Sequence, residues 1–291
     1  RQMAEEKGLV TQMGIQIHSF KEYRSAVELI QSGLIGKVHT VRAWSPKNWG
    51  YDGPAPTGSD PVPDNLDWNL WLGKAQERPY KEGFYHPVNW RKVLDFGCGT
   101  LGDMGVHIFD TPYTALALDV PKTIMTQCRK PNGFAHPENN VVTYEFPGTE
   151  FTTDSLKWVW YDGPGAPAMH EELELPQGDK LPEQGSMFIG EKGRLLLPHW
   201  DFPKLIVEGA YEKVDYPDLD EHDHYHQFVD ACLGKDKTSA PFSYAARLTE
   251  AILLGVVGNR FPNQTLHWNN STQLFDEKEA NQYLSGSNRS F

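Results

Sequence analysis

The chain has 291 residues, of which 27 are basic and 39 acidic, so its formal net charge is −12. No dense run of lysine and arginine offsets this charge, which argues against nucleic acid or an anionic membrane surface as a partner. No apolar run approaches the length that spans a bilayer, so we expect no membrane partner and a small polar substrate.

The cysteines and histidines give little sign of a metal site. Cys98, Cys128 and Cys232 are far apart and form no C-x-x-C pair, which indicates neither a zinc site nor a disulfide framework. The histidine-rich run at 222–226 places histidines two residues apart, and such side chains diverge on a helix. We therefore expect no metal.

The N-terminal third predicts short elements around one long loop. Residues 1–8 are expected to form a helix, and 9–14 a strand without obvious neighbours in this chain. Ser19 and Glu22 form a capping-box pattern, which predicts a helix from Ser19 to about Gly33. Alternation predicts a strand at 38–44. The loop that follows, 45–64, is long enough to indicate a lid or a subunit contact; a short helical turn is expected at 66–73.

The stretch 97–110 holds the strongest candidates for catalytic residues. A glycine-rich turn leads into a predicted helix that carries Asp103, His107 and Asp110 at positions i, i+4 and i+7, which share one face. Asp103 is expected in the first turn, where the helix dipole stabilises an anion, and would orient His107 for acid/base work. The alternative is that Asp103 only caps the helix and that His107 is an ordinary interior histidine.

Gly97, Gly99 and Gly102 also spell the G-x-G-x-x-G of a dinucleotide-binding turn, with Asp119 downstream. The true motif needs a strand before the glycines and a second strand that ends in the acidic residue. Asp119 follows the helix with no strand between, and Asp103 would place a negative charge where the pyrophosphate binds. We therefore reject this interpretation.

The second half of the chain predicts a sheet followed by two helices. Most connections between the strands are too short for a crossover helix, so neighbours should pair antiparallel in one open sheet. One face would take the helices, and the other could be a subunit interface. A Pro/Gly-rich excursion at 162–184 is expected to be solvated. The predicted strands are Thr123–Arg129, Val141–Phe146, Ser155–Tyr161, Ser186–Ile189, Arg194–Leu197 and Leu205–Glu208.

The two predicted helices cover about 222–233 and 244–257. In the first, the apolar spacing places Tyr225, Phe228, Val229 and Cys232 toward the core. The fold class expected from all these elements is α+β, an open and mainly antiparallel sheet with helices packed on one face.

Taken together, these segments resemble the C-terminal portion of the glucose-fructose oxidoreductase / inositol dehydrogenase / MocA (Gfo/Idh/MocA) family. The signature Gly102-Asp103-x-Gly105-x-His107-x-x-Asp110 is its most specific part. The other matching stretches are 14–19 (GIQIHS), 33–38 (GLIGKV), 66–73 (LDWNLWLG), 78–80 (RPY), 90–110, 160–163 (WYDG), 190–193 (GEKG) and 242–255 (FSYAARLTEAILLG).

The resemblance implies a two-domain enzyme in which an N-terminal Rossmann domain binds NAD or NADP. Residues 1–17 would be the last helix and strand of that domain, and 18–291 the substrate and oligomerisation domain, which would form a homo-dimer or tetramer through its sheet. The nucleotide fingerprint and the Glu-Lys-Pro segment with the family's catalytic lysine are missing. The isolated chain is therefore expected to hold the cofactor weakly and to be inactive by itself.

For the intact protein, the resemblance implies an NAD(P)-dependent oxidoreductase that moves hydride between a secondary alcohol of a sugar or polyol and nicotinamide. His107 would be the acid/base, oriented by Asp103. Two alternatives stay open, a redox-neutral NAD-dependent glycosidase of the same family and a non-catalytic sugar-binding or dimerisation domain. The residues implied to border the substrate are Trp90, Arg91, Asp110 and His18, with Gln16 on the nicotinamide side.

Overall fold

The structure is a computed structural model that describes residues 1–286 and 289. Its strands are β1 (Val38–Ser45), β2 (Thr123–Gln127), β3 (Asn140–Pro147), β4 (Thr152–Asp162), β5 (Gly185–Gly190), β6 (Arg194–Pro198), β7 (Lys204–Val207), β8 (Ala210–Glu212), β9 (Thr265–Asn269) and β10 (Leu274–Phe275). Its α-helices are α1 (Gln2–Glu6), α2 (Lys21–Gln31), α3 (Trp68–Leu72), α4 (Gly99–Ala115), α5 (His224–Cys232) and α6 (Phe242–Gly258). Short 3₁₀ helices are η1 (Gln16–Ser19), η2 (Asn89–Lys92), η3 (Glu171–Leu173) and η4 (Ala280–Tyr283).

The strands form one open sheet in the order β10-β9-β2-β3-β4-β1-β5-β6-β7-β8. Nearly all pairs are antiparallel, which confirms the predicted fold class. The exception is β1 beside β4, which is parallel, with Val41 opposite Trp158. Our expectation of antiparallel neighbours concerned the strands from residue 123 onward, which short connections join, so it does not cover this pair. A long segment that includes α4 joins these two strands, so their directions are independent of that rule.

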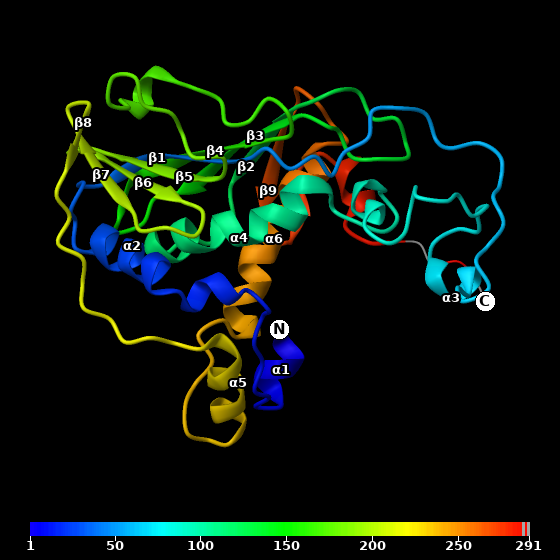
Figure 1. Ribbon diagram of the computed structural model, residues 1–291, viewed down its shortest axis with the longest axis horizontal. Helices are drawn as coiled ribbons and strands as arrows, with labels where there is room; N and C mark the ends of the chain where they lie inside the picture. Colours follow the sequence, from blue (N-terminus) through cyan, green and yellow to red (C-terminus); the bar gives the residue numbers. More distant parts are fainter. Residues whose placement is uncertain (287–288, 290–291) are drawn as a thin grey trace.

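The main core lies between the sheet and the helices α2, α4 and α6, which Figure 1 shows on one side of the sheet. On β4 the alternate residues Leu156, Trp158 and Trp160 are fully buried. Phe109 of α4 stacks on Trp158 with a centroid distance of 4.1 Å. Stacked aromatic pairs contribute about 0.5–1.5 kcal/mol beyond the area that they bury. These contacts fix α4 against the middle of the sheet.

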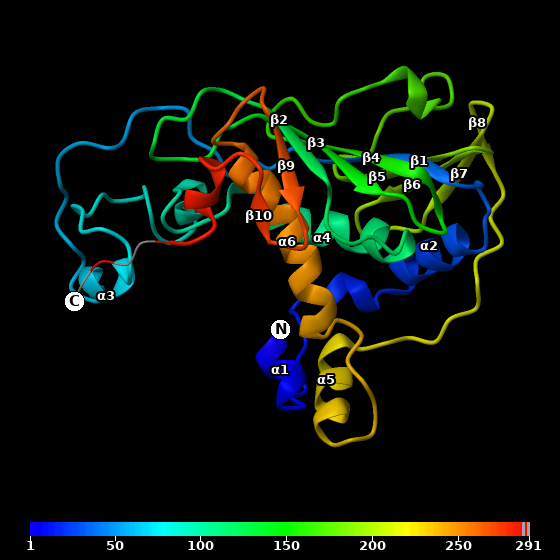
Figure 2. The same ribbon diagram turned by 180° about the vertical axis from the view of Figure 1, so that it is seen from behind.

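Part of the opposite face is covered by the chain itself, as Figure 2 shows for the segment that follows β4. Leu173 of η3 packs with Trp44 and Met187 in a second buried cluster. Glu172 pairs with Arg42 of β1. The prediction that 162–184 is a solvated loop is therefore wrong around η3, because the apolar side chains that alternate outward on β1 and β5 need a cover. An oligomer formed through the sheet, which stays a prediction, would have to use the other strands.

Two predictions near the N-terminus differ from the structure. Residues 9–14 form no strand, and the Met13 N–H donates to the carbonyl of Ala240 instead of to a strand partner. The helix α2 begins at Lys21, two residues later than the capping box indicated. Ser19 does not cap it, because its hydroxyl is bonded at 2.9 Å to Nδ1 of His224. In both places a contact with a distant segment replaces the local pattern.

The orientation predicted for α5 is also wrong. Tyr225 and Val229 are 64% and 54% exposed, and Phe228 and Cys232 are exposed as well. Figure 1 shows α5 beside α1 and away from the sheet. None of these four residues belongs to the main core cluster. The spacing of apolar residues correctly predicted a helix, but it does not determine which of these residues are buried.

The carboxyl group of Asp162, at the end of β4, is buried in the core. It is 4% exposed and accepts a hydrogen bond of 2.7 Å from Nε1 of Trp160. Burial raises the pKa of Asp162 to about 8. The folded protein therefore holds a proton that the unfolded chain releases near pH 4. The stability that this proton contributes is present below that pH and is lost as the pH rises to about 8.

We predict that Asp162→Asn flattens this pH dependence, because the amide keeps the shape and cannot ionise. The wild type should lose up to about 1.4 kcal/mol per pH unit between about pH 5 and pH 8, and the variant much less. Urea unfolding at a series of pH values measures this. Asp154→Asn, at an exposed position of the same strand, is the control and should follow the wild type. An Asp162→Asn profile that parallels the wild type would contradict the prediction.

Candidate functional site

The glycine-rich turn before α4 serves close packing. Gly99 begins the helix with φ of +63°, and a Cβ there would lie 2.9 Å from His136. A Cβ at Gly97 would lie 2.3 Å from the carbonyl oxygen of Arg91. The turn follows η2 and not a strand, which agrees with rejecting the dinucleotide-binding interpretation. Asp103 lies beyond the first turn of α4, so our expectation that the first turn stabilises it was wrong.

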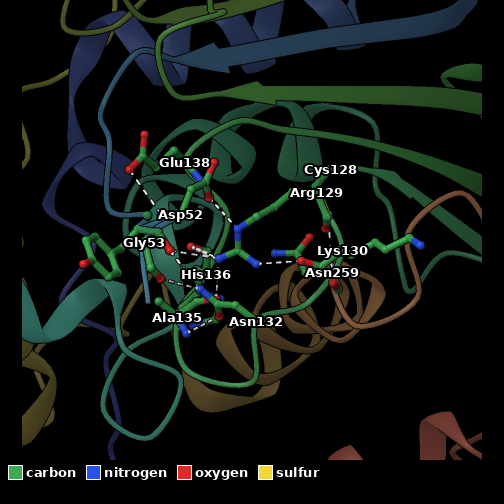
Figure 3. A network of polar contacts seen from close by, with 12 residues as sticks. Asp52, Gly53, Cys128, Arg129, Lys130, Asn132, Ala135, His136, Glu138 and Asn259 are labelled. Atoms are coloured by element: carbon green, nitrogen blue, oxygen red, sulfur yellow. Dashed lines mark hydrogen bonds and ion pairs between the residues drawn. The ribbon is translucent and has the colours of Figure 1, made fainter. Parts of the chain in front are cut away.

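A polar network holds this turn in place (Figure 3). Arg129 pairs with Asp52 at 2.5 Å and donates to the carbonyls of Tyr51 and His136. Nε2 of His136 is bonded at 2.8 Å to the carbonyl of Gly97. Burial lowers the pKa of His136 to about 4, so the ring is neutral and Nε2 carries the hydrogen that it donates. The long loop 45–64 is thereby tied to the start of α4.

Asp103 contacts Arg91 and not His107. Its Oδ1 accepts a hydrogen bond of 2.9 Å from Nε of Arg91, and the guanidinium also lies over the rings of Trp90 and Trp49. No hydrogen bond joins Asp103 to His107 in the described part of the chain. The predicted orientation of the imidazole by Asp103 is therefore not found, because this carboxylate instead accepts a charge-assisted hydrogen bond from Arg91. Asp103 acts on His107 only through its charge, which raises the pKa of the imidazole.

His107 is half-buried and faces a cavity of about 530 Å³. Burial lowers its pKa below 6.5, against the opposing charges of Asp103 and Asp110, so the imidazole is neutral near pH 7. The cavity lies where α4, η1, α5 and the turn between β6 and β7 meet. Its other lining residues are Gln16, Ile17, Phe20, Met104, His199, Trp200 and Tyr225.

Gln16 is thus the predicted site residue that shares the cavity with His107. Sequence reasoning missed His199 and Trp200, which lie in the turn after β6. The His199 ring lies 6.4 Å from that of His107, and burial lowers the pKa of His199 to about 4. A His-Trp pair at the end of an apolar strand was the available signal, and on its own it is weak.

Asp110 lies about one helical turn after His107 on α4 and is 1% exposed. Both of its carboxylate oxygens lie 2.9 Å from Nδ1 of His18, and Oδ1 accepts a hydrogen bond of 2.6 Å from the hydroxyl of Tyr244. The acid–imidazole pair that we expected within α4 is formed here instead, between α4 and η1. His18 and Asp110 line a separate, smaller cavity of about 220 Å³. The predicted site residues therefore fall into three groups, around His107, around Asp103 and around Asp110.

The described residues show neither a cluster for a metal ion nor a membrane-spanning helix. In the described residues, no group of three or more His, Cys, Asp or Glu side chains is placed to hold a metal ion. None of the helices there has the length and hydropathy needed to cross a bilayer. The open sheet and the cavity beside α4 are thus the main features of the described structure.

Residues 21–141 match the family model GFO_IDH_MocA_C2, described as "Oxidoreductase family, C-terminal alpha/beta domain". The match runs from α2 to the start of β3, so it includes α4 and His107. This part of the chain is therefore similar to the C-terminal α/β domain of the Gfo/Idh/MocA oxidoreductase family, the family that the sequence motifs resemble. A search of curated proteins found no match.

Solved structures share the fold at low sequence identity. An NAD-binding protein from Listeria innocua is 15% identical with a TM-score of 0.54, and the match covers 91% of this chain and 66% of that one. An aldose-aldose oxidoreductase from Caulobacter crescentus is 10% identical (TM-score 0.54, 90% and 65%). An oxidoreductase from Thermotoga maritima is 16% identical (TM-score 0.52, 94% and 66%). The chain thus spans about two thirds of the length of these three proteins.

We predict that Asp110→Asn lowers the pKa of His18. Burial lowers that pKa, but the hydrogen bond and the charge of Asp110 raise it by more, so the net shift is upward. The pair stabilises the fold below pH 6.5, and its contribution is lost as the pH rises through the raised pKa. The variant should therefore lose about 1–3 kcal/mol, most of it at acid pH. An NMR titration of the His18 ring and unfolding at two pH values measure both effects.

Glu277→Gln is the control for this experiment. Glu277 pairs with His267 at 2.8 Å, but the imidazole is about half exposed. Because exposed pairs contribute only about 0–1 kcal/mol, this change should have a small effect on stability. An unshifted His18 titration in Asp110→Asn would show that Asp110 is not the group that holds the imidazole.

Proposed function

We propose that this chain is the substrate-binding part of an NAD(P)-dependent oxidoreductase that acts on a secondary alcohol of a sugar or polyol. The observation that carries the proposal is the neutral, half-buried imidazole of His107 beside a cavity of about 530 Å³, on the helix that the family match includes. A base with a pKa below neutrality can accept a hydroxyl proton at pH 7. Redox chemistry requires a nicotinamide, which this chain is not equipped to hold by itself.

The fit of the dinucleotide to this chain is poor. The space that a pyrophosphate would need beside Gly97 and Gly99 is filled by the Arg91 carbonyl and by His136. We propose that NAD or NADP is held mainly by a separate nucleotide-binding unit, of which residues 1–17 would be the last part. Gln16, at the edge of the His107 cavity, would then contact the nicotinamide side. The nicotinamide exchanges the hydride, and this chain supplies the remaining steps.

In these steps the substrate lies in the cavity with its reacting hydroxyl at His107. The imidazole takes the hydroxyl proton during oxidation and returns it during reduction. Asp103 keeps the pKa of His107 from falling further and holds Arg91, which with Trp90 would border the substrate from η2, before α4. Asp110 and His18 are engaged with each other and would support the site through the placement of η1.

We predict that His107→Ala in the intact protein lowers kcat for alcohol oxidation by about 10²–10⁴-fold. The wild-type rate should fall in acid, as His107 takes up a proton below pH 6.5, and should be level above that pH. The measurement is formation of reduced nicotinamide with a panel of neutral aldoses and polyols.

His39→Ala serves as the control, because His39 is an exposed histidine on β1 outside the cavity. It should leave both the rate and the pH profile unchanged. Near-normal turnover of His107→Ala on a substrate of the wild type would refute the proposed acid/base role.

A further inference from the structure

The side chain of Trp200 is unusually exposed for a residue of its size. It is 66% exposed and lies in the turn between β6 and β7, at the His107 cavity. Its backbone has φ of +70°, a left-handed conformation that large non-glycine residues rarely adopt. Such conformations cost about 1–3 kcal/mol and are concentrated at functional sites. An exposed indole held at this cost needs an explanation.

Trp200 is held in one orientation despite its exposure. Its backbone N–H donates to the Tyr23 hydroxyl at 3.0 Å, and its ring meets Phe20 edge-on with a centroid distance of 5.8 Å. Its indole N–H donates to Nε2 of His199. Because the indole nitrogen can only donate, Nε2 must accept. The hydrogen of the His199 ring is then on Nδ1, which donates to the Tyr23 hydroxyl at 2.7 Å.

This arrangement has a consequence for binding. A side chain that is already ordered loses little rotamer freedom when a ligand contacts it. The face of the indole is apolar and carries the negative side of the ring quadrupole. The C–H groups on one face of a sugar ring carry a slight positive charge, so they pack well against such a surface.

The lining of the cavity also favours an uncharged ligand. No lysine, arginine, aspartate or glutamate is among its lining residues, and the His107 and His199 rings are both neutral near pH 7 because burial lowers each pKa. A carboxylate or phosphate would therefore be buried against a lining without a cation, which is costly. The guanidinium of Arg91, proposed to border the substrate, is already paired with Asp103. Gln16 donates to the Tyr225 hydroxyl at 2.9 Å, and these two groups can bond the hydroxyls of a neutral ligand.

We propose that Trp200 is a stacking platform for an uncharged sugar or cyclitol ring in the His107 cavity, and that His199 is the residue that positions the indole. This inference rests on the proposed function for the class of substrate and adds the choice of neutral rings over uronates, aldonates and sugar phosphates. Trp200 would be a specificity-determining residue, while His107 carries the proton.

The test measures binding without any cofactor. The purified chain is titrated by ligand-observed NMR with methyl glucoside, methyl galactoside and myo-inositol, and with glucuronate and glucose 6-phosphate as charged probes. At least one neutral probe should bind about tenfold or more tighter than both charged ones. Trp200→Ala should weaken its binding about tenfold, which corresponds to 1.4 kcal/mol, and Trp200→Phe should restore most of it. Tyr283→Ala, which removes a 42% exposed aromatic outside the cavity, is the control.

The role of His199 is tested by rescue. His199→Ala should weaken binding of the same probe, while His199→Gln should recover it, because an amide oxygen can accept the indole N–H. A purely structural role would not distinguish the two variants by probe affinity at equal thermal stability. Recovery by His199→Gln supports positioning, and equal affinity of both variants overturns it.

The platform and the proposed enzyme activity can fail separately. Binding of no neutral probe, equal binding of a charged probe, or unchanged binding in Trp200→Ala would overturn the platform, whatever the intact protein catalyses. Conversely, the acid/base role is tested by the turnover of His107→Ala in the intact protein. If that variant kept its turnover, the proposed function would fail while the platform stood.

Discussion

The site depends on the packing of α4 against the middle of the sheet. Phe109 stacks on Trp158, and Leu101 and Ile108 are buried on the same helix. The helix also packs against α2 and α6, so it is held from three directions. At the α6 contact the fit is close, since a Cβ at Gly255 would lie 2.9 Å from the side chain of Leu101. Each polar side chain of α4 is consequently presented at a fixed place.

This fixed helix separates charges that its sequence places close together. Asp103 is paired with Arg91 and Asp110 with His18, and each partner comes from outside α4. Asp110 requires a partner, because an unpaired carboxylate that is only 1% exposed would lower the stability of the fold by several kcal/mol. His107 lies between the two and has no ion-pair partner in the described residues. It is thus the group of this helix whose protonation responds to what enters the cavity.

The sequence was informative where local periodicity decides structure. Alternation located β1 to β7, and the signature at 102–110 located the helix that lines the cavity. It failed where the outcome depends on a distant partner. Ser19 bonds His224 and Asp103 bonds Arg91, and neither preference is visible in the pattern around the residue. The same limit applies to Trp200, whose orientation comes from Tyr23, far away in the chain.

Stability and substrate choice are carried by different parts of this structure. Phe109→Ala would leave a void beneath the sheet and lower the free energy of unfolding by about 3–5 kcal/mol. Replacing the 66% exposed Trp200 removes few contacts of the core and would relieve a left-handed backbone only if glycine took its place. A turn between two strands can therefore change the ligand surface while α4 keeps His107 where it is. A domain built this way can retain one proton-transfer group and accept different rings beside it.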